Sequence, residues 1–271
     1  RLLRENNEKM RQEFTANVSH ELKTPLTSIS GYAELIETGI AKPADVPEFG
    51  RKIHVEASRM IQLVNDILQL SHLDNVSESH DTPQMETVDL LDVAKECVER
   101  QKVNAQKSFI SLTYIGESAP ILGSRSLLDE LCQNLCDNAI RYNHPGGKVQ
   151  LITACARDGH CSLTVKDNGI GMTPEFQKIL FEPFTRADDK RTTKIQGTGL
   201  GMAIAQNAVN MMNGTIDVES ELGKGSKFTV TIFLKLQNRS TEQIDELVHL
   251  PVLVVDDDVL CCESTVEMLQ E

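Results

Sequence analysis

Long apolar runs and tryptophan are both missing from this sequence of 271 residues. Runs such as Val252–Val255 fall far short of the roughly 20 apolar residues that a membrane-spanning helix needs, so we expect no direct membrane contact from this chain. Aromatic residues make up only 4%, but hydrophobic residues reach 40% and charged residues 25%. That composition is typical of a globular protein and excludes a disordered or collagen-like chain.

Positive charge is also scarce, because 27 Lys and Arg residues stand against 40 Asp and Glu residues, a net charge of −13. Such an acidic chain repels phosphate backbones and anionic lipids, so nucleic acid is excluded as a partner. The chain begins with Arg1, and no signal-peptide pattern follows it. We interpret it as the cytoplasmic fragment of a longer protein, whose full-length form can still be anchored in the cell membrane.

The seven cysteines include no C-x-x-C pair. Most of them fall within apolar helix or strand patterns, which indicates reduced thiols in a cytosolic compartment without a redox or metal role. Cys132 and Cys136 lie four residues apart and are expected in a helix core rather than on a metal ion.

Apolar residues recur every three or four positions in two stretches, Phe14–Ile36 and Ile53–Ser71, which predicts two long amphipathic helices. A break at Thr38–Pro47, which contains glycine and two prolines, joins them. Two helices cannot cover such faces by packing only on each other. We therefore expect a homodimer in which two helical hairpins form a four-helix bundle.

The rest of the chain, after a polar linker at 74–85, mixes helix and strand patterns and predicts an α+β sandwich of a sheet against helices. A serine at position 124 is expected to cap one of the helices. The helices are expected near 90–104, 124–142 and 201–212, and the strands near 109–115, 148–156, 161–166, 215–220 and 227–233.

A histidine on the first helix faces away from the apolar stripe. His20 lies two residues from Val18 and from Leu22, which is roughly 200° around the helix from each. A single exposed histidine is usually an ordinary surface residue. Its neighbours change this interpretation, because Glu21 follows directly and Pro25 is expected to bend the helix one turn later.

The segment Phe14–Ile29, which reads FTANVSHELKTPLTSI, resembles the phosphoacceptor box of sensor histidine kinases. The resemblance implies that His20 attacks the terminal phosphoryl group of ATP and that Glu21 fixes the imidazole tautomer and takes up its proton. It also implies that Thr24 orients the water that removes phosphate from a response-regulator partner. The alternative for Thr24 is a helical hydroxyl that bonds back to a backbone carbonyl.

A second motif lies on the predicted helix near 124–142. Asn134, Asn138 and Arg141 share one helix face at spacings of four and three, and amide oxygens can hold Mg²⁺ while a guanidinium can bind phosphate. The stretch Asn134–Tyr142 resembles the asparagine box of the same kinases, which implies that Asn138 holds the Mg²⁺ of bound ATP. Tyr142 either packs on the nucleotide or is a half-buried helix residue.

Two glycine loops, Asp167–Met172 and Gly197–Gly201, flank the segment Phe181–Phe184. Glycines permit positive φ angles and close backbone approach, and amides at a helix start attract phosphate. This order resembles the Bergerat-type ATP-binding fold of histidine kinases, gyrase-like ATPases and Hsp90 chaperones. The resemblance implies that Asp167 accepts the adenine amino group and that a mobile lid spans 185–196. It places Gly169, Gly171, Gly197, Thr198, Gly199, Leu200 and Gly201 at the base and phosphates, and Arg186 on a phosphate.

One residue separates these related families. Gyrase-like and Hsp90-like ATPases carry a glutamate one helical turn before the Mg²⁺ asparagine, where it activates water, but this chain has Asn134 there. Because an amide cannot take a proton from water, the phosphoryl group is kept for an incoming nucleophile. We therefore predict an ATP-dependent protein-histidine kinase of a two-component system. The alternative is a non-phosphorylating ATPase or a scaffold of the same fold.

Near the end of the sequence, Val252–Asp258 resembles the first strand and acidic cluster of receiver domains. Asp256 and Asp257 are Mg²⁺ ligands there only if the receiver is complete, and the alternative is a plain acidic strand end. The expected parent is a hybrid kinase, so the receiver is supplied in cis or by a separate response regulator. The resulting division is an upstream helix end (1–13), the phosphotransfer hairpin (14–73), a linker (74–85), the ATP-binding domain (86–236), a linker (237–250) and a truncated, doubly wound α/β receiver start (251–271).

Overall fold

The computed structural model describes residues 2–78, 84–156, 159–187 and 197–233, and the side chains in 14–71, 84–156, 159–187 and 197–232. Residues Arg1–Lys235 form one compact unit. None of the helices in these described ranges combines the length and the apolar character that crossing a bilayer requires.

The end of the chain, Leu236–Glu271, does not belong to this unit. The expected linker 237–250 and the expected receiver start 251–271, with Asp256 and Asp257, lie outside the described residues. The receiver interpretation and its alternative, an acidic strand end, therefore stay predictions.

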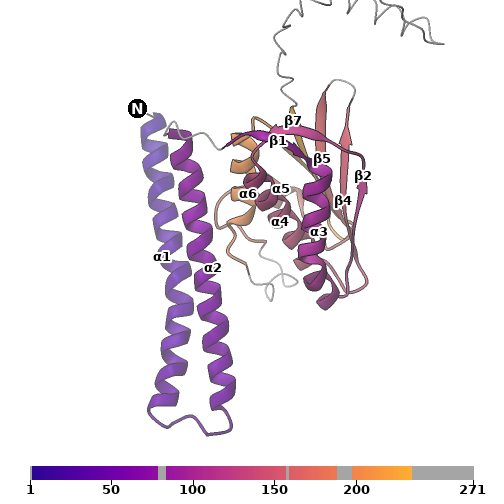
Figure 1. The fold of residues 1–271 in the computed structure, drawn as a ribbon. Helices are drawn as coiled ribbons and strands as arrows, with labels where there is room; N and C mark the ends of the chain where they lie inside the picture. Colours follow the sequence, from indigo (N-terminus) through magenta and orange to yellow (C-terminus); the bar gives the residue numbers. More distant parts are fainter. Residues whose placement is uncertain (1, 79–83, 157–158, 188–196, 234–271) are drawn as a thin grey trace, which may run out of the picture. The chain divides into compact units, whose positions relative to one another are not determined.

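The first part of the fold is a hairpin of two long helices, α1 (Leu2–Glu37) and α2 (Val46–Glu78), which lie side by side in Figure 1. Both predicted helices are confirmed, and α1 runs through the buried Pro25 without a break. The linker expected from residue 74 is wrong at its start, because α2 continues to Glu78. Neither proline nor glycine interrupts the chain there before Pro83, so nothing stops the helix.

The second part of the fold is built on a five-stranded sheet in the order β2-β4-β5-β7-β6. The pair β2–β4 is parallel and the other pairs are antiparallel, which confirms the hairpin expected between 148 and 166. The strands are β2 (Ser111–Gly116), β4 (Lys148–Cys155), β5 (His160–Asp167), β6 (Thr215–Glu221) and β7 (Gly225–Phe233).

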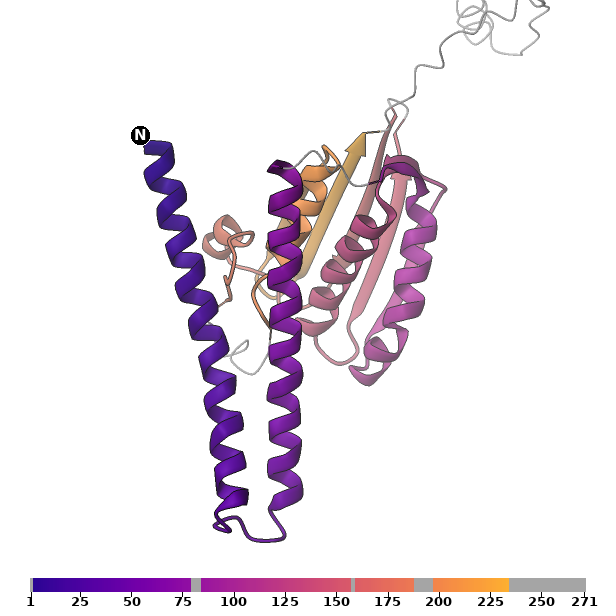
Figure 2. The ribbon, with the colours of Figure 1, turned by 60° about the vertical axis from the view of Figure 1, so that its left-hand side comes forward.

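Three predicted helices, α3 (Leu90–Lys107), α4 (Arg125–Arg141) and α6 (Gly201–Met211), cover one face of this sheet in Figure 2. Their apolar faces meet the buried side of the strands, so the expected α+β sandwich is confirmed. The largest fully buried side chains include Leu90, Leu128, Leu131, Leu135, Leu151, Leu163 and Ile204. Cys132 and Cys136 are fully buried among them, as expected for helix-core residues.

Ser124 stands at the N-cap position of α4, but its side chain makes no capping hydrogen bond, so the expected serine cap is wrong in this respect. Its hydroxyl instead lies 3.0 Å from the hydroxyl of Ser126. The carbonyl of Ser124 still accepts the hydrogen bond of Leu128 that begins the helix.

Three short elements escaped the sequence analysis because each is too short to show a periodicity. Strands β1 (Glu86–Asp89) and β3 (Pro120–Gly123) form a separate two-stranded antiparallel sheet. Helix α5 (Pro174–Ile179) follows Thr173, whose hydroxyl accepts from the backbone N–H of Phe176 at 3.3 Å. A threonine cap before proline is a helix-start signal that could have revealed α5.

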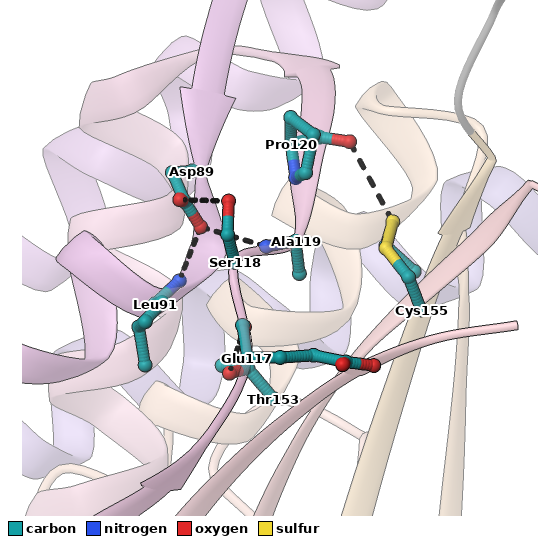
Figure 3. The surroundings of a disulfide bond; sticks show 9 residues. Asp89, Leu91, Glu117, Ser118, Ala119, Pro120, Thr153 and Cys155 are labelled. Atoms are coloured by element: carbon teal, nitrogen blue, oxygen red, sulfur yellow. Dashed lines mark hydrogen bonds between the residues drawn. A yellow bond between two sulfur atoms is a disulfide. The ribbon is translucent and has the colours of Figure 1, made fainter.

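Cys155 and Cys161 form a disulfide between β4 and β5, which corrects the expectation of reduced thiols for these two residues, whereas Cys97, Cys132 and Cys136 are free. The two residues are direct partners in the antiparallel register, with their Cα atoms 4.1 Å apart. Their spacing of six residues hides this pairing, because only the hairpin turn brings them together. Figure 3 shows the surroundings of the bond, where the Cys161 sulfur lies 3.5 Å from the carbonyl oxygen of Pro120.

Figure 3 also shows Asp89, the N-cap of α3, beside the loop that leads into β3. Its carboxylate accepts hydrogen bonds from the N–H groups of Leu91 and Ala119, at 2.9 and 2.8 Å, and from the Ser118 hydroxyl at 2.6 Å. Burial alone would raise the pKa of Asp89, but these three hydrogen bonds outweigh it and lower the pKa below its ordinary value. The ionised carboxylate thus ties the start of α3 to β3.

Candidate nucleotide and phosphotransfer site

A cavity of about 540 Å³ opens at the carboxyl end of α4, between the two glycine loops. Residues from all the predicted nucleotide motifs line it, although they lie far apart in the sequence. They are Asn134, Asn138, Arg141, Tyr142, Asp167, Gly171, Arg186, Gly197, Thr198, Gly199 and Gly201. Two predicted residues are not part of this lining, because Leu200 is fully buried in the core and Gly169 is buried against the backbone of Tyr142.

The half-buried edge of α4, beside its buried leucines, presents the asparagine motif to this cavity. The Asn138 amide nitrogen faces the sulfur of Met202 at 3.1 Å, so its Oδ1 is the atom left for a cation. Arg141 pairs with Asp137 one turn earlier on the same helix. Tyr142, at the C-cap of α4, is half-buried and lines the cavity.

Asp167, at the end of β5, is held by its backbone neighbours. Its Oδ1 accepts from the N–H of Gly169 at 2.8 Å and from the N–H of Ser226 at 3.3 Å. Burial raises the pKa of this carboxyl, and the two hydrogen bonds oppose that rise. Since both bonds use Oδ1, the other carboxylate oxygen is available to accept the amino group of a base. Ser226 escaped the sequence analysis because a backbone N–H leaves no signal in the residue type.

The first glycine loop needs its glycines for close packing. Gly171 has a φ of +62°, and a Cβ there would lie 2.0 Å from the carbonyl oxygen of Glu221. Gly225 begins β7 with a φ of +100°, and a Cβ there would lie 2.2 Å from the carbonyl oxygen of Asp167. The loop therefore sits directly on the turn between β6 and β7, which holds Asp167 at the cavity wall.

The second glycine loop, Gly197–Gly201, packs against α4 and against Phe184. Gly199 has a φ of +74°, its carbonyl accepts from the N–H of Phe184 at 3.0 Å, and a Cβ on it would meet the Phe184 backbone at 2.9 Å. A Cβ on Gly197 would lie 2.9 Å from an Arg141 nitrogen, and one on Gly201 would lie 3.2 Å from the Asn134 oxygen. The loop thus lies close to the polar face of α4 and leads into the N-terminus of α6, where backbone N–H groups can bind an anion.

The expected lid, 185–196, is described only as far as Ala187. Arg186, expected on a phosphate, is exposed and lines the cavity. The remaining lid cations, Lys190, Arg191 and Lys194, lie outside the described residues.

The helical hairpin also lines this cavity, which the sequence analysis missed. Arg59, Gln62 and Asp66 of α2 face it at spacings of three and four. The two Asp66 oxygens accept from Thr198 Oγ1 and from Gln62 Nε2, each at 2.6 Å. The sequence feature that could have revealed these residues is their spacing, since three polar side chains at helical intervals interrupt the apolar face of α2.

The residues predicted for the phosphoacceptor site lie on α1. His20 is exposed, as expected from its position on the helix. Glu21 Oε2 accepts from an Arg59 nitrogen at 3.2 Å. The Thr24 hydroxyl donates to the His20 carbonyl at 3.3 Å, which is the alternative geometry left open for this threonine. Near the same helix, the rings of Phe14 and Phe184 lie 5.4 Å apart.

Comparison with known families identifies both halves of the chain. Residues 10–76 match the His Kinase A (phospho-acceptor) domain. Residues 123–237 match the histidine kinase-, DNA gyrase B-, and HSP90-like ATPase domain. This chain belongs to the histidine kinase family. Membership in the second domain family implies that this domain binds ATP.

Relatives and solved structures agree with this assignment. The sensor-like histidine kinase SenX3 of Mycolicibacterium smegmatis is 37% identical over 229 residues, which is 83% of this kinase chain and 58% of SenX3. The chain thus spans little more than half the length of this curated relative. The histidine kinase AdeS of Acinetobacter baumannii has a TM-score of 0.65 at 25% identity, covering 80% of this chain and 98% of that one.

The histidine kinase ThkA, solved in complex with the response regulator protein TrrA, has the same fold as this kinase chain. Its TM-score is 0.67 at 21% identity, covering 87% of this chain and 67% of that one. The helical hairpin followed by a sheet domain is therefore a shared histidine kinase architecture.

Proposed function

We propose that the full protein is an ATP-dependent protein-histidine kinase that phosphorylates His20 and passes the phosphoryl group to an aspartate of a receiver domain. The observation that carries this proposal is the meeting of Asn138, Asp167 and Thr198 in one cavity whose wall includes α2. Helix α2 also contacts Glu21, the neighbour of His20. The same helix therefore adjoins both the nucleotide cavity and the acceptor.

Asp167 and Asn138 supply the groups that recognise ATP. The Asp167 carboxylate accepts the adenine amino group with the oxygen that its backbone neighbours leave available. Asn138 Oδ1 is a suitable hard ligand for Mg²⁺, and Mg²⁺ when bound neutralises charge on the phosphate oxygens. Gly197, Thr198 and Gly199 let the backbone approach the phosphates.

Transfer rather than hydrolysis is favoured by Asn134, which lines the cavity one turn before Asn138. An amide cannot act as a general base toward water, so hydrolysis is slow and the phosphoryl group stays on ATP until another nucleophile attacks it. The exposed imidazole of His20 is such a nucleophile, and the adjacent Glu21 carboxylate can accept its second ring proton. Positioning and charge neutralisation then supply most of the catalysis.

The hairpin surface supports a homodimer. Leu26, Ile61 and Leu68 are 56%, 64% and 62% exposed, although they belong to the apolar faces of the two helices. A second hairpin would cover these side chains in a four-helix bundle. We assign the hairpin from residue 14 to the end of α2 at Glu78 to this phosphotransfer domain, and 86–236 to the ATP-binding domain.

The second partner in this proposal is a receiver domain, supplied in cis after residue 250 or by a separate response regulator. ThkA is a histidine kinase solved with such a regulator. Thr24 faces solvent one turn after His20, where its hydroxyl could orient the water that dephosphorylates the partner. We place this fragment in the cytoplasm, where receiver domains and ATP are available.

The test of this function is the phosphorylation of the purified chain by Mg-ATP. We expect an acid-labile, alkali-stable label that is lost in His20→Gln, because only His20 accepts the phosphoryl group. His54→Gln, which changes another exposed histidine of the hairpin, is the matched control and should label normally. Equal labelling of His20→Gln would contradict the proposal, and steady ADP release without label would favour the ATPase alternative.

A further inference from the structure

A polar stripe on α2 contacts both the second glycine loop and α1, the helix that carries His20. It consists of Arg59, Gln62 and Asp66, all of which line the cavity. Asp66 accepts from Thr198 of the second glycine loop, and Arg59 donates to Glu21 beside His20. Seven residues at about 1.5 Å each place these two contacts about 10 Å apart along the helix.

Arg59 has two possible anionic partners. Its ion pair with Glu21 is half-buried, since the two side chains are 24% and 28% exposed. The same side chain lines the cavity together with Asn138, Thr198 and Arg186. A guanidinium binds phosphate oxygens in a bidentate manner, as it binds a carboxylate. A phosphate that reaches the acceptor end of the cavity therefore competes with Glu21 for Arg59.

We propose that Arg59 is a further catalytic residue of the phosphotransfer reaction. It pairs with Glu21 when the cavity holds no nucleotide, and it binds the terminal phosphate when ATP fills the cavity. This exchange of partners releases the Glu21 carboxylate at the moment when His20 needs a proton acceptor. The inference rests on the proposed kinase function, because it assigns a role within that reaction.

The phosphoryl transfer that follows involves ATP, His20, Glu21 and Arg59. One ring nitrogen of His20 forms a bond to the terminal phosphorus, and the bond from that phosphorus to the bridging oxygen breaks. ADP leaves with the electron pair of that bond. The proton on the other ring nitrogen of His20 passes to the Glu21 carboxylate, while the Arg59 guanidinium neutralises charge on the transferring oxygens.

The competing explanation is that Arg59 only ties α1 to α2. Kinetics of the full chain separate the two, using Arg59→Gln, Arg59→Lys and the control Arg51→Gln, an exposed arginine of the same helix. For Arg59→Gln we expect His20 labelling at saturating ATP to fall on the order of 100-fold, as for other losses of transition-state charge stabilisation. The ATP concentration for half-maximal rate should change much less, because in the ground state Arg59 exchanges the Glu21 carboxylate for the phosphate with little net gain in binding energy. Arg59→Lys should give an intermediate labelling rate, because lysine keeps the positive charge but cannot form the two parallel hydrogen bonds of a guanidinium.

A spectroscopic measurement gives a result that does not depend on labelling. The side-chain Nε signal of Arg59, assigned by comparison with Arg59→Lys, should shift on adding a non-hydrolysable ATP analogue and Mg²⁺. ADP and Mg²⁺ should not produce this shift, because ADP lacks the terminal phosphate.

Three results would overturn the assignment of Arg59. They are wild-type labelling by Arg59→Gln, an equal loss in Arg59→Lys and Arg59→Gln with the same fall in melting temperature, and identical Nε signals with ADP and with the analogue. Failure of the unaltered chain to label His20 would instead overturn the kinase proposal. In that case the Nε measurement alone decides whether Arg59 binds the terminal phosphate.

Discussion

The sheet domain buries its leucines more completely than the helical hairpin, in which Leu63 and Leu70 are buried but Leu26 and Leu68 are exposed. Leu128, Leu131 and Leu135 of α4 are fully buried, whereas Leu68 of α2 is 62% exposed, although both helices show apolar periodicity. Burying a leucine stabilises a fold by roughly 1.5–3 kcal/mol relative to leaving it exposed. The sheet domain therefore stabilises itself, and the hairpin depends on an additional surface for part of its stability.

Removing one buried and one exposed leucine should give the largest contrast. We expect Leu135→Ala to destabilise the sheet domain by about 2–5 kcal/mol, because it leaves a cavity in a core with no exposed side. The matched Leu68→Ala should change the unfolding free energy of the hairpin by less than about 0.5 kcal/mol at concentrations where the chain is monomeric. Urea unfolding of both variants measures the difference. Equal losses would show that Leu68 is packed as tightly as a core leucine in the monomer.

The disulfide gives a smaller effect within the sheet domain alone. Replacing both Cys155 and Cys161 by Ala should cost about 2 kcal/mol, because the bond closes only a short loop in the unfolded chain. Denaturant unfolding of the oxidised, reduced and double-Ala proteins measures this loss of unfolding free energy. The unfolding of the hairpin is followed separately. A reductant that changes the stability of the double-Ala protein as well would mean that the effect does not come from this bond.

The smallest effect concerns Asp89, whose lowered pKa makes it a pH-dependent contributor to the sheet domain. A carboxyl with a lowered folded pKa stabilises the fold above its unfolded pKa of about 4, and this contribution is lost as the pH falls through the folded value. We expect Asp89→Asn to cost about 1 kcal/mol at pH 7, as for the loss of an ionised helix cap, and less at pH 3. Unfolding at the two pH values measures this. A cost at pH 3 equal to that at pH 7 would mean that the carboxylate charge is not involved.

The nucleotide side of the site could be predicted because its signals are local. The spacing of Asn134, Asn138 and Arg141 places them on one helix face whatever the rest of the chain does. Glycines at 171 and 199 indicated close backbone approach, and both have positive φ angles. Each of these inferences needs only a few neighbouring residues.

Contacts between distant segments could not be predicted in this way. Arg59 meets Glu21 across 38 residues, and Asp66 meets Thr198 across 132. The spacing of Arg59, Gln62 and Asp66 marks a polar stripe on α2, but it does not show which distant segments this stripe contacts. The pairing of Cys155 with Cys161 likewise depends on the register of two strands, which is a property of the sheet.

The close approach of Gly225 to Asp167 limits which genes can encode this domain. Every non-synonymous single-base change in a glycine codon, other than to a stop, adds a Cβ, and a Cβ here would lie 2.2 Å from a backbone oxygen. Residue 225 is also paired with Glu221 in the register of β6 and β7, so the backbone has little room to retreat. In a library of randomised genes selected for ATP binding, this codon should tolerate only silent changes.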